Sequence, residues 1–273
     1  MVVDRDGSEV PDYLTPVRSD GAAIVFGAGN GIGRQAAHAL AQTGKRTICV
    51  DIDDRRARRV ADEIGGIACS ADATEQVGME RVIEVIETEG LVVDCVVDVI
   101  GVAYFSRVDE IDDGSWDRQL AIVVDHARRI LRDLQPRLPD GATITFVSSA
   151  VAHSGGQGMA AYAAAKAALH SLVQSAAVEL AERRVLVNAV SPGVVATPRM
   201  NELLAGKRAE EFARAIPLGR LVTPQEVAAA LLFVALGSCG SLTGQSIVID
   251  GGVSARFPYP DFVDRGRPPR SDG

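Results

Sequence analysis

Seven short runs of apolar, mostly β-branched residues recur along the chain, and stretches with helical periodicity separate them. The runs are AAIVFG (22–27), TICVD (47–51), GIACS (66–70), LVVDCVVDVIG (91–101), TITFVSS (143–149), RVLVNAVSPG (184–193) and QSIVIDGG (245–252). Because none alternates strictly between apolar and polar residues, each strand is expected to be covered on both faces. Strands of this kind, joined through helices, form a parallel sheet with right-handed crossovers. We therefore predict an α/β fold: a doubly wound, seven-stranded parallel sheet with helices on both faces, in three α/β/α layers.

The two ends of the chain differ from this pattern. Residues 1–20 are polar, contain two prolines and read as an N-terminal extension. Residues 21–252 show no break in composition, so we expect them to form a single domain. Residues 253–273 hold four prolines, four arginines and three aromatic residues, and read as a C-terminal extension. We expect its aromatic residues, Phe257, Tyr259 and Phe262, to pack against other parts of the protein, since exposing them to solvent is unfavourable.

Composition excludes several classes of protein. The formal net charge of −8 argues against a nucleic-acid partner. No apolar run is long enough to span a membrane, and the N-terminus lacks the apolar core of a signal peptide. The four cysteines form no C-x-x-C pair and have no histidine at metal-ligand spacing. They are typical of buried free thiols in a reducing compartment, so we expect a cytoplasmic protein without a metal site.

A glycine-rich turn follows the first predicted strand and opens a helix. Its sequence is FGAGNGIG (26–33), and Asp51 ends the next strand, 18 residues after Gly33. Glycine allows the backbone to approach a pyrophosphate closely, and the helix N-terminus offers free N–H groups to it. An acidic residue at the end of the second strand is placed to accept hydrogen bonds from ribose hydroxyls. This combination predicts a Rossmann-type dinucleotide site.

Asp51 also bears on the choice between NAD and NADP. A carboxylate at this position repels a 2′-phosphate, and Asp53 and Asp54 add to that repulsion. The neighbouring arginines at 55, 56, 58 and 59 could hold a phosphate, but their helical spacing favours a solvated face. We therefore expect NAD as the cofactor, with NADP as the less favoured alternative.

The segment AYAAAKAAL (161–169) places one tyrosine and one lysine in an alanine-rich helix. Residues four apart share a helix face, so Tyr162 and Lys166 point the same way. A nearby ammonium stabilises a phenolate and lowers the pKa of the phenol, which makes it a usable acid or base. Ser149 ends the strand just upstream, where a parallel sheet forms its ligand crevice. On spacing alone, a core tyrosine and a solvated lysine would be the simpler interpretation.

Taken together, Ser149, Tyr162, Lys166 and the glycine-rich turn resemble the short-chain dehydrogenase/reductase family, in its single-domain branch. The resemblance runs from about residue 21 to residue 252. Further matches are Asp72 after the third strand, Asn188 in VNAVSPG, and the final TGQSIVIDGG.

The resemblance implies an NAD(P)-dependent oxidoreductase that interconverts a secondary alcohol and a ketone. Tyr162 would be the general acid/base, Lys166 would lower its pKa and bind the nicotinamide ribose, and Ser149 would orient the substrate oxygen. The implied cofactor-binding residues are Gly27, Asn30, Gly31, Ile32, Gly33, Asp51, Ile52, Asp72, Ala73, Val99, Gly101, Tyr162, Lys166, Pro192, Val195 and Thr197.

Three positions depart from the family pattern. Phe26 stands where the family has threonine, and Asp98-Val99-Ile100-Gly101 stands where it has N-N-A-G. Val123 replaces the asparagine that helps to hold a water in the family's proton relay. His126, one turn further along, could take over that relay, or it could be a surface or interface residue. Other possibilities are a water held by backbone groups alone, or a specialised or non-catalytic NAD-binding protein.

The expected substrate contacts come from three loops. His153 and Met159 flank Tyr162 on the upstream side, and Met200 lies in residues 198–217, which resemble the family's mobile substrate lid. Tyr104 and Phe105 add apolar surface, so we expect a substrate with an apolar skeleton, cyclic ones included. The helices around 116–134 and from 159 onward resemble the family's subunit contacts, which implies a homotetramer, with a dimer as the second choice.

Overall fold

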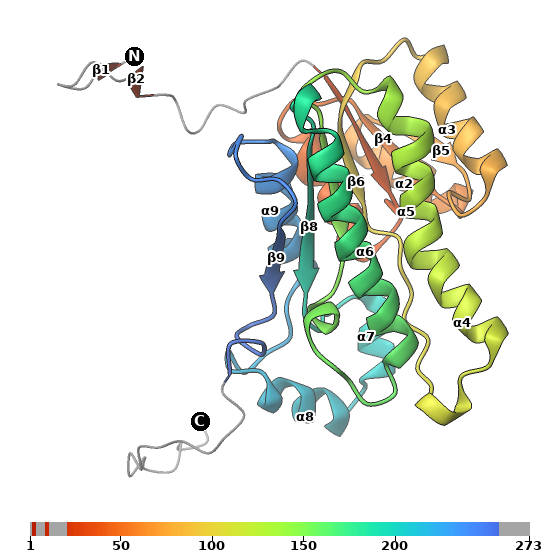
Figure 1. The fold of residues 1–273 in the computed structure, drawn as a ribbon, viewed down its shortest axis with the longest axis vertical. Helices are drawn as coiled ribbons and strands as arrows, with labels where there is room; N and C mark the ends of the chain where they lie inside the picture. Colours follow the sequence, from red (N-terminus) through yellow and green to blue (C-terminus); the bar gives the residue numbers. More distant parts are fainter. Residues whose placement is uncertain (1, 4–8, 11–20, 257–273) are drawn as a thin grey trace.

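The computed structural model describes residues 2–3, 9–10 and 21–256 (Figure 1). Its centre is a seven-stranded, all-parallel sheet with the order β5-β4-β3-β6-β7-β8-β9. The strands are β3 (Ala22–Phe26), β4 (Thr47–Asp51), β5 (Ile67–Ser70), β6 (Val93–Asp98), β7 (Thr143–Val147), β8 (Leu186–Pro192) and β9 (Ser246–Ile249). Each lies within one of the seven apolar runs, so the predicted sheet is confirmed. Two short strands, β1 (Val2–Val3) and β2 (Glu9–Val10), form a separate antiparallel pair in the predicted N-terminal extension.

Helices cover both faces of the sheet. They are α1 (Gly31–Ala41), α2 (Asp54–Ile64), α3 (Gln76–Thr88), α4 (Asp113–Leu120), α5 (His126–Arg129), α6 (Ala160–Glu179), α7 (Pro198–Leu203), α8 (Lys207–Ala215) and α9 (Pro224–Ala235). Buried residues of α3, α5 and α6 join one hydrophobic cluster, and those of α1, α2 and α9 join another. The two clusters make the predicted three-layer, Rossmann-type architecture.

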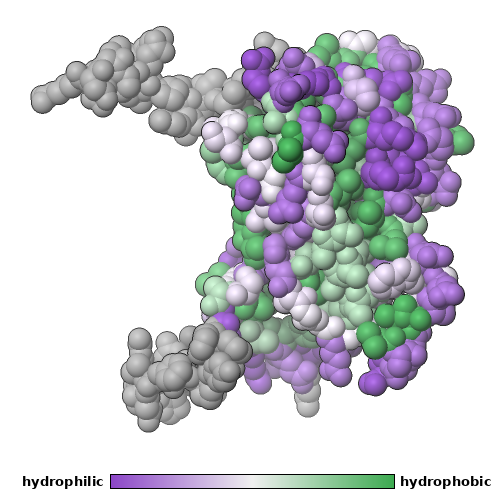
Figure 2. All heavy atoms as spheres, in the orientation of Figure 1, coloured by the Kyte–Doolittle hydropathy of each residue, from purple (hydrophilic) through white to green (hydrophobic). Residues whose placement is uncertain are grey.

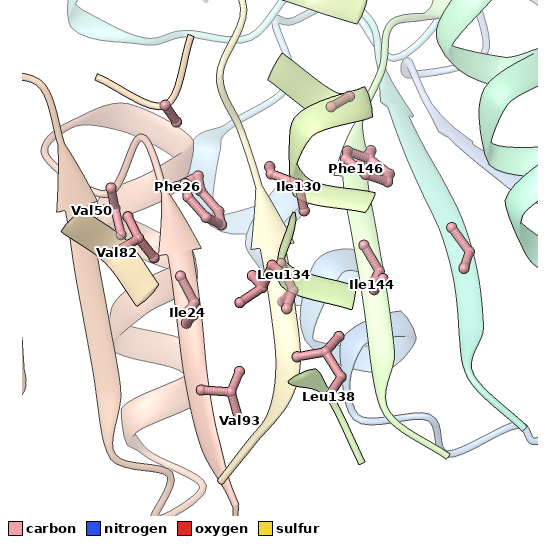
Figure 3. Packing of buried hydrophobic residues seen from close by; sticks show 14 of the residues in the cluster. Ile24, Phe26, Val50, Val82, Val93, Ile130, Leu134, Leu138, Ile144 and Phe146 are labelled. Atoms are coloured by element: carbon pink, nitrogen blue, oxygen red, sulfur yellow. The ribbon is translucent and has the colours of Figure 1, made fainter. Parts of the chain in front are cut away.

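The strands divide their side chains between these two clusters because successive residues point to opposite faces. In β3, Ile24 and Phe26 enter the first cluster, whereas Ala23 and Val25 enter the second. Figure 3 shows Ile24 and Phe26 in the first cluster, with Ile130 and other side chains of the helical layer beside them. Full burial of a side chain of this size contributes roughly 1.5–3 kcal/mol, so a slip of one residue in register would be costly.

The long helical stretch from α4 to α5 is not a uniform α-helix. A π-helical turn, Ala121–Asp125, joins α4 to α5, and a second, Ile130–Leu134, follows α5. π turns are often found at functional sites because the extra residue re-aims the side chains. Here both Val123 and His126 are fully buried.

The four cysteines are free thiols. Cys49, Cys69 and Cys95 are buried, as expected. Cys239 is exposed, contrary to the expectation of a buried thiol, because it follows the end of α9. No helix in the described ranges is long and apolar enough to cross a membrane. The described part of the chain also contains no group of three acidic, histidine or cysteine side chains suited to a metal ion. The aromatic residues of the C-terminal extension lie outside the described residues.

Candidate active site

The structure brings Ser149, Tyr162 and Lys166 to the carboxyl end of β7. Ser149 is the second residue after β7 and caps a 3-10 turn, where its hydroxyl accepts a hydrogen bond from Val151 N at 3.3 Å. Tyr162 and Lys166 lie one turn apart near the start of α6. The Lys166 ammonium is 5.8 Å from the centroid of the Tyr162 ring. The shared helix face predicted from the sequence is therefore confirmed.

Lys166 is buried, with 2% of its surface exposed. Its Nζ donates a hydrogen bond to the carbonyl of Val147 at 2.7 Å. Burial disfavours the ammonium and lowers the pKa of Lys166 to about 8, and the negative charge of Asp98 acts in the opposite direction. The side chain therefore titrates close to physiological pH, which is unusual for lysine.

Tyr162 is partly buried, and burial raises the pKa of its phenol above the usual value. A hydrogen bond with the Ser149 hydroxyl lowers the pKa, but by less than burial raises it. The net shift is thus opposite to the one expected from Lys166, so the expectation of a lowered phenol pKa was wrong for this structure: burial outweighs the hydrogen bond, and Lys166 is not among the causes of the shift.

The glycine-rich turn lies at the N-terminus of α1, and its backbone requires glycine at two points. Gly27 has φ +77° and Gly31 has φ +52°, in the left-handed region that other residues rarely adopt. Gly33 is needed for a different reason: a Cβ there would lie 2.0 Å from the carbonyl oxygen of Gly27. The turn is therefore pressed against the start of the helix, as close approach to a pyrophosphate requires.

A cleft of about 250 Å³ lies beside this turn. Its lining residues are Gly27, Val50, Asp51, Ile52, Ala71, Asp72, Ala73, Thr74, Ile100, Gly101, Val102 and Ile122. Six of them are among the cofactor-binding residues that the sequence implies: Gly27, Asp51, Ile52, Asp72, Ala73 and Gly101. Its wall is apolar with a few convergent polar groups, which is typical of a cofactor cleft.

Asp51 is held in a fixed orientation at this cleft. Its two carboxylate oxygens accept hydrogen bonds from Gly29 N at 2.8 Å and from Asp53 N at 3.0 Å. Arg59, expected on a solvated face, instead donates to the Gly29 carbonyl at 2.7 Å. Asp53 caps α2 and pairs with Arg56. These groups fit an adenosine ribose, whose hydroxyls need an anchored acceptor.

The remaining predicted cofactor residues border the same region from other elements. Asn30 caps α1, and Ile32 follows it in the first turn. The Val99 side chain lies against both Gly27 and Gly33, and the Thr197 side chain lies against Gly31. Pro192 ends β8. Val195 forms a bridge with Val222 just before α7.

Hydrogen bonds fix the loop after β6 at two places. Gln119 is fully buried; its amide nitrogen donates to Val102 O at 2.9 Å, and its carbonyl accepts from Tyr104 N at 3.0 Å. Further along, Ser106 N donates to Gly158 O at 3.0 Å, next to Met159. Sequence reasoning missed Gln119, because a single glutamine in a helical pattern carries no local signal of burial.

His153 lines a cavity of about 210 Å³ whose other lining residues come from α6, β8 and β9 and include none of the catalytic trio. The centroid of its ring lies 4.5 Å from that of His170, and the two ring planes are tilted by 47°. The His170 imidazole lies within hydrogen-bond distance of the Ser191 and Ser246 hydroxyls, at 3.1 and 3.2 Å. Met200 lies in the first turn of α7, where Thr197 caps the helix. A substrate contact from His153 stays a prediction.

One departure from the family pattern, Asp98, meets the suggested relay residue His126 in the interior. His126 Nε2 lies 2.9 Å from Asp98 Oδ2, and neither side chain is exposed. The alternative of a surface or interface histidine was therefore wrong. The reason is the π turn before α5, which directs His126 toward the sheet.

Comparison with known proteins finds relatives over most of the chain. Residues 27–254 match a family model described as enoyl-(acyl carrier protein) reductase. The chain is 35% identical over 253 residues to galactitol 2-dehydrogenase (L-tagatose-forming) of Cereibacter sphaeroides, covering 88% of this chain and 98% of that protein. It is 34% identical over 240 residues to 2,3-dihydro-2,3-dihydroxybenzoate dehydrogenase of Escherichia coli, covering 84% and 94%.

A solved structure is similar as well. The 3-ketoacyl-(acyl-carrier-protein) reductase of Brucella melitensis, complexed with NADH, superposes with a TM-score of 0.78 at 28% identity, covering 86% of this chain and 98% of that one. The family match, over residues 27–254, spans most of the chain. The chain belongs to the short-chain dehydrogenase/reductase family of oxidoreductases.

Proposed function

We propose that the protein is an NAD-dependent oxidoreductase that interconverts a secondary alcohol and a ketone on an apolar substrate, cyclic ones included. The observation that carries the proposal is the convergence of Ser149, Tyr162 and Lys166 at the carboxyl end of β7. A parallel α/β sheet binds its ligands at this edge. The bound nicotinamide supplies the hydride chemistry, and the protein supplies position and proton transfer.

Each member of the trio has a distinct task in this proposal. Tyr162 exchanges a proton with the substrate oxygen, donating it when a ketone is reduced and accepting it when an alcohol is oxidised. Ser149 donates a hydrogen bond to the same oxygen and stabilises charge on it. Lys166, when protonated, stabilises the Tyr162 phenolate and holds the nicotinamide ribose.

The preference for NAD rests on the anchored carboxylate of Asp51. Both of its oxygens already accept backbone N–H groups, so it cannot easily swing away to admit a 2′-phosphate. Arg56 and Arg59 are occupied by Asp53 and the Gly29 carbonyl. Binding of NADH and NADPH, measured by titration of nicotinamide fluorescence, tests this. Wild type should bind NADH more tightly than NADPH, and Asp51→Ser should narrow or reverse this difference in affinity. Tighter binding of NADPH than of NADH by wild type would contradict the preference for NAD.

Exposed apolar side chains in the predicted substrate segments support the proposed substrate class. Tyr104 and Phe105 are 41% and 52% exposed beside the loop that Gln119 holds. Leu203, on α7, is also exposed. One of the two relatives described above is named for a cyclic dihydrodiol and the other for an open-chain polyol, so a panel should contain both. We expect higher kcat/KM for cyclic and apolar secondary alcohols; turnover of small charged hydroxy acids alone would refute the substrate class.

We also propose a homotetramer, with a dimer as the second choice. The outward face of α6 carries exposed small residues, Ala164, Ala167, Ala168 and Ser171. Figure 2 shows a pale green, weakly hydrophobic band along this helix. Small residues allow two helices to approach closely. Size-exclusion chromatography with light scattering measures the assembly, and a monomer would contradict the proposal.

The alternative is a protein that binds NAD without catalysis, which the buried Val123 motivates. Comparison of wild type with Tyr162→Phe separates the two. Reduced-nicotinamide absorbance should rise with an alcohol substrate in wild type and not in the variant, while both bind NADH. Binding without turnover in wild type, across the whole panel, would support the alternative.

A further inference from the structure

A buried carboxylate and a buried imidazole lie side by side at the carboxyl end of β6. Asp98 is the last residue of that strand, and neither Asp98 nor His126 is exposed. His126 Nε2 is 2.9 Å from one carboxylate oxygen, and Ile100 N donates to the other at 3.2 Å. Both oxygens of Asp98 therefore have a donor. The other imidazole nitrogen, Nδ1, has no partner among the described residues. We therefore assign the proton of the neutral His126 ring to Nε2, where it can be donated to the Asp98 carboxylate.

Lys166 reaches the same place from α6. Asp98 pairs with Phe146 across the sheet, and the next residue of β7, Val147, accepts the hydrogen bond of the Lys166 ammonium. Gly101, three residues after Asp98, lies so close that a Cβ there would be 3.1 Å from Nζ. The ammonium and the Asp98 carboxylate thus occupy one end of the β6–β7 pair.

Few other ionisable groups face this ammonium. The neighbouring strands β7 and β8 carry no titratable side chain. From α6 itself come Tyr162 and His170, and from α5 comes His126. The ionisable side chains of α4, the π turn and the 3-10 turn, Asp113, Asp117, Arg118, Asp125 and His153, are exposed or partly exposed. Asp98 is therefore the carboxylate placed to balance the buried charge of Lys166, through its Coulombic field rather than through a direct ion pair of the kind that Asp94 makes with the buried Lys45 at the other end of β6.

We propose that Asp98 and His126 form a positioning pair that keeps Lys166 protonated: Asp98 supplies the compensating negative charge, and His126 holds that carboxylate ionised by donating Nε2–H to it. A buried carboxylate without donors takes up a proton and loses its charge. The Coulombic effect of Asp98 on the pKa of Lys166 is in the required upward direction. The inference rests on the proposed function for its consequence: a charged Lys166 keeps Tyr162 able to exchange protons near neutral pH.

The ionisation of Lys166 can be measured directly in the full-length protein. The chain has three lysines, Lys45, Lys166 and Lys207, so lysine labelled with ¹³C at Cε gives three NMR titration curves, assigned with Lys→Met variants. Asp98→Asn removes the charge while keeping the shape. We expect it to lower the titration midpoint of Lys166 by about one unit or more. Asp94→Asn is the matched control, since it breaks a buried pair on the same strand, and should leave Lys166 unchanged.

Two variants of His126 test its part separately. Gln places a donor where Nε2 lies and should keep the Lys166 midpoint near that of wild type. Leu offers no donor and leaves Ile100 N as the remaining donor to Asp98, so the Lys166 midpoint should fall toward that of Asp98→Asn. An unchanged midpoint in Asp98→Asn, or equal midpoints in the two His126 variants, would overturn the proposal. If Asp98→Asn does not fold, the His126 comparison alone decides.

The NMR titration requires no turnover, so the two proposals can fail separately. A lowered Lys166 midpoint in an enzyme that never reduces NAD would leave the positioning pair standing and remove the proposed function. Where turnover is found, the pH profile gives a second readout. In Asp98→Asn, the rising limb of kcat/KM for alcohol oxidation should move to higher pH, because fewer Lys166 side chains are charged at neutral pH. Asp94→Asn should keep the wild-type profile.

Discussion

The contact between Gly33 and the glycine-rich turn offers the sharpest test of how the cofactor site is built. Gly33 lies in the first turn of α1 and its φ is not in the left-handed region, so alanine meets no backbone strain there. The difficulty is steric. A Cβ at this position would lie 2.0 Å from Gly27 O, 2.8 Å from Gly27 C and 2.9 Å from a methyl of Val99. Since non-bonded heavy atoms prefer separations of roughly 3.5 Å, the turn must move by at least about 1 Å.

A displacement of this size has calculable consequences for Gly33→Ala. Overpacking of this kind costs roughly 1–3 kcal/mol of stability. A misplacement of about 1 Å in a binding element can lower activity roughly 100-fold. We expect NADH affinity, measured by calorimetry, to fall at least tenfold while the variant remains folded. The control is Gly240→Ala, because Gly240 has no neighbour within 4 Å and no positive φ. NADH affinity equal to wild type in folded Gly33→Ala would refute the close-approach reasoning.

Three further predictions concern single buried side chains. Gln119→Leu removes both hydrogen bonds to the 102–104 loop, so KM for the substrate should rise several-fold with a smaller change in kcat and no change in NADH affinity. An unchanged KM would show that Gln119 is not required to hold the loop in its binding conformation. The pKa of Lys166 falls from 10.5 to about 8 on folding; the unfolded chain therefore binds more protons between these values, and wild-type stability should rise with pH there by about 3 kcal/mol relative to Lys166→Met. The same difference in unfolding free energy between the two proteins at pH 8 and at pH 10.5 would contradict this. Burial lowers the pKa of His170 from 6.5 to about 4. Wild type should therefore lose stability relative to His170→Gln as pH falls from 6.5 to 4. An equal loss of stability in the two proteins over this pH range would contradict the burial of His170 in its neutral form.

Much of the fold could be predicted because the signals were local. The strands are apolar on both faces, and the turn at Gly27 needs a backbone that only glycine adopts readily. The pairing of Tyr162 with Lys166 follows from helix geometry alone. These features need no knowledge of distant residues, so the sequence was sufficient for them.

Other features depend on contacts between distant segments and could not be predicted. His126 is three residues from Val123, but only the π turn and the end of β6 decide that it meets Asp98. Burial of Gln119 depends on the path of the 102–104 loop. The ring contact of His153 with His170 joins residues on different elements, and the histidine at 153 carries no sequence signal of its partner. The dominance of burial over the Ser149 hydrogen bond in the pKa of Tyr162 likewise requires the packed structure.

Direct transfer of hydrogen to the cofactor tests the central claim most closely. The enzyme is incubated with NAD and secondary alcohols that carry deuterium on the carbinol carbon, and the recovered nicotinamide is analysed by mass spectrometry and NMR. We expect deuterium at C4 of the reduced ring with wild type and a loss of roughly 100-fold or more in its rate of appearance with Tyr162→Phe. Two results would contradict the account. One is deuterium transfer at the same rate in Tyr162→Phe as in wild type, and the other is no deuterium transfer by wild type with any alcohol and ketone pair in the panel.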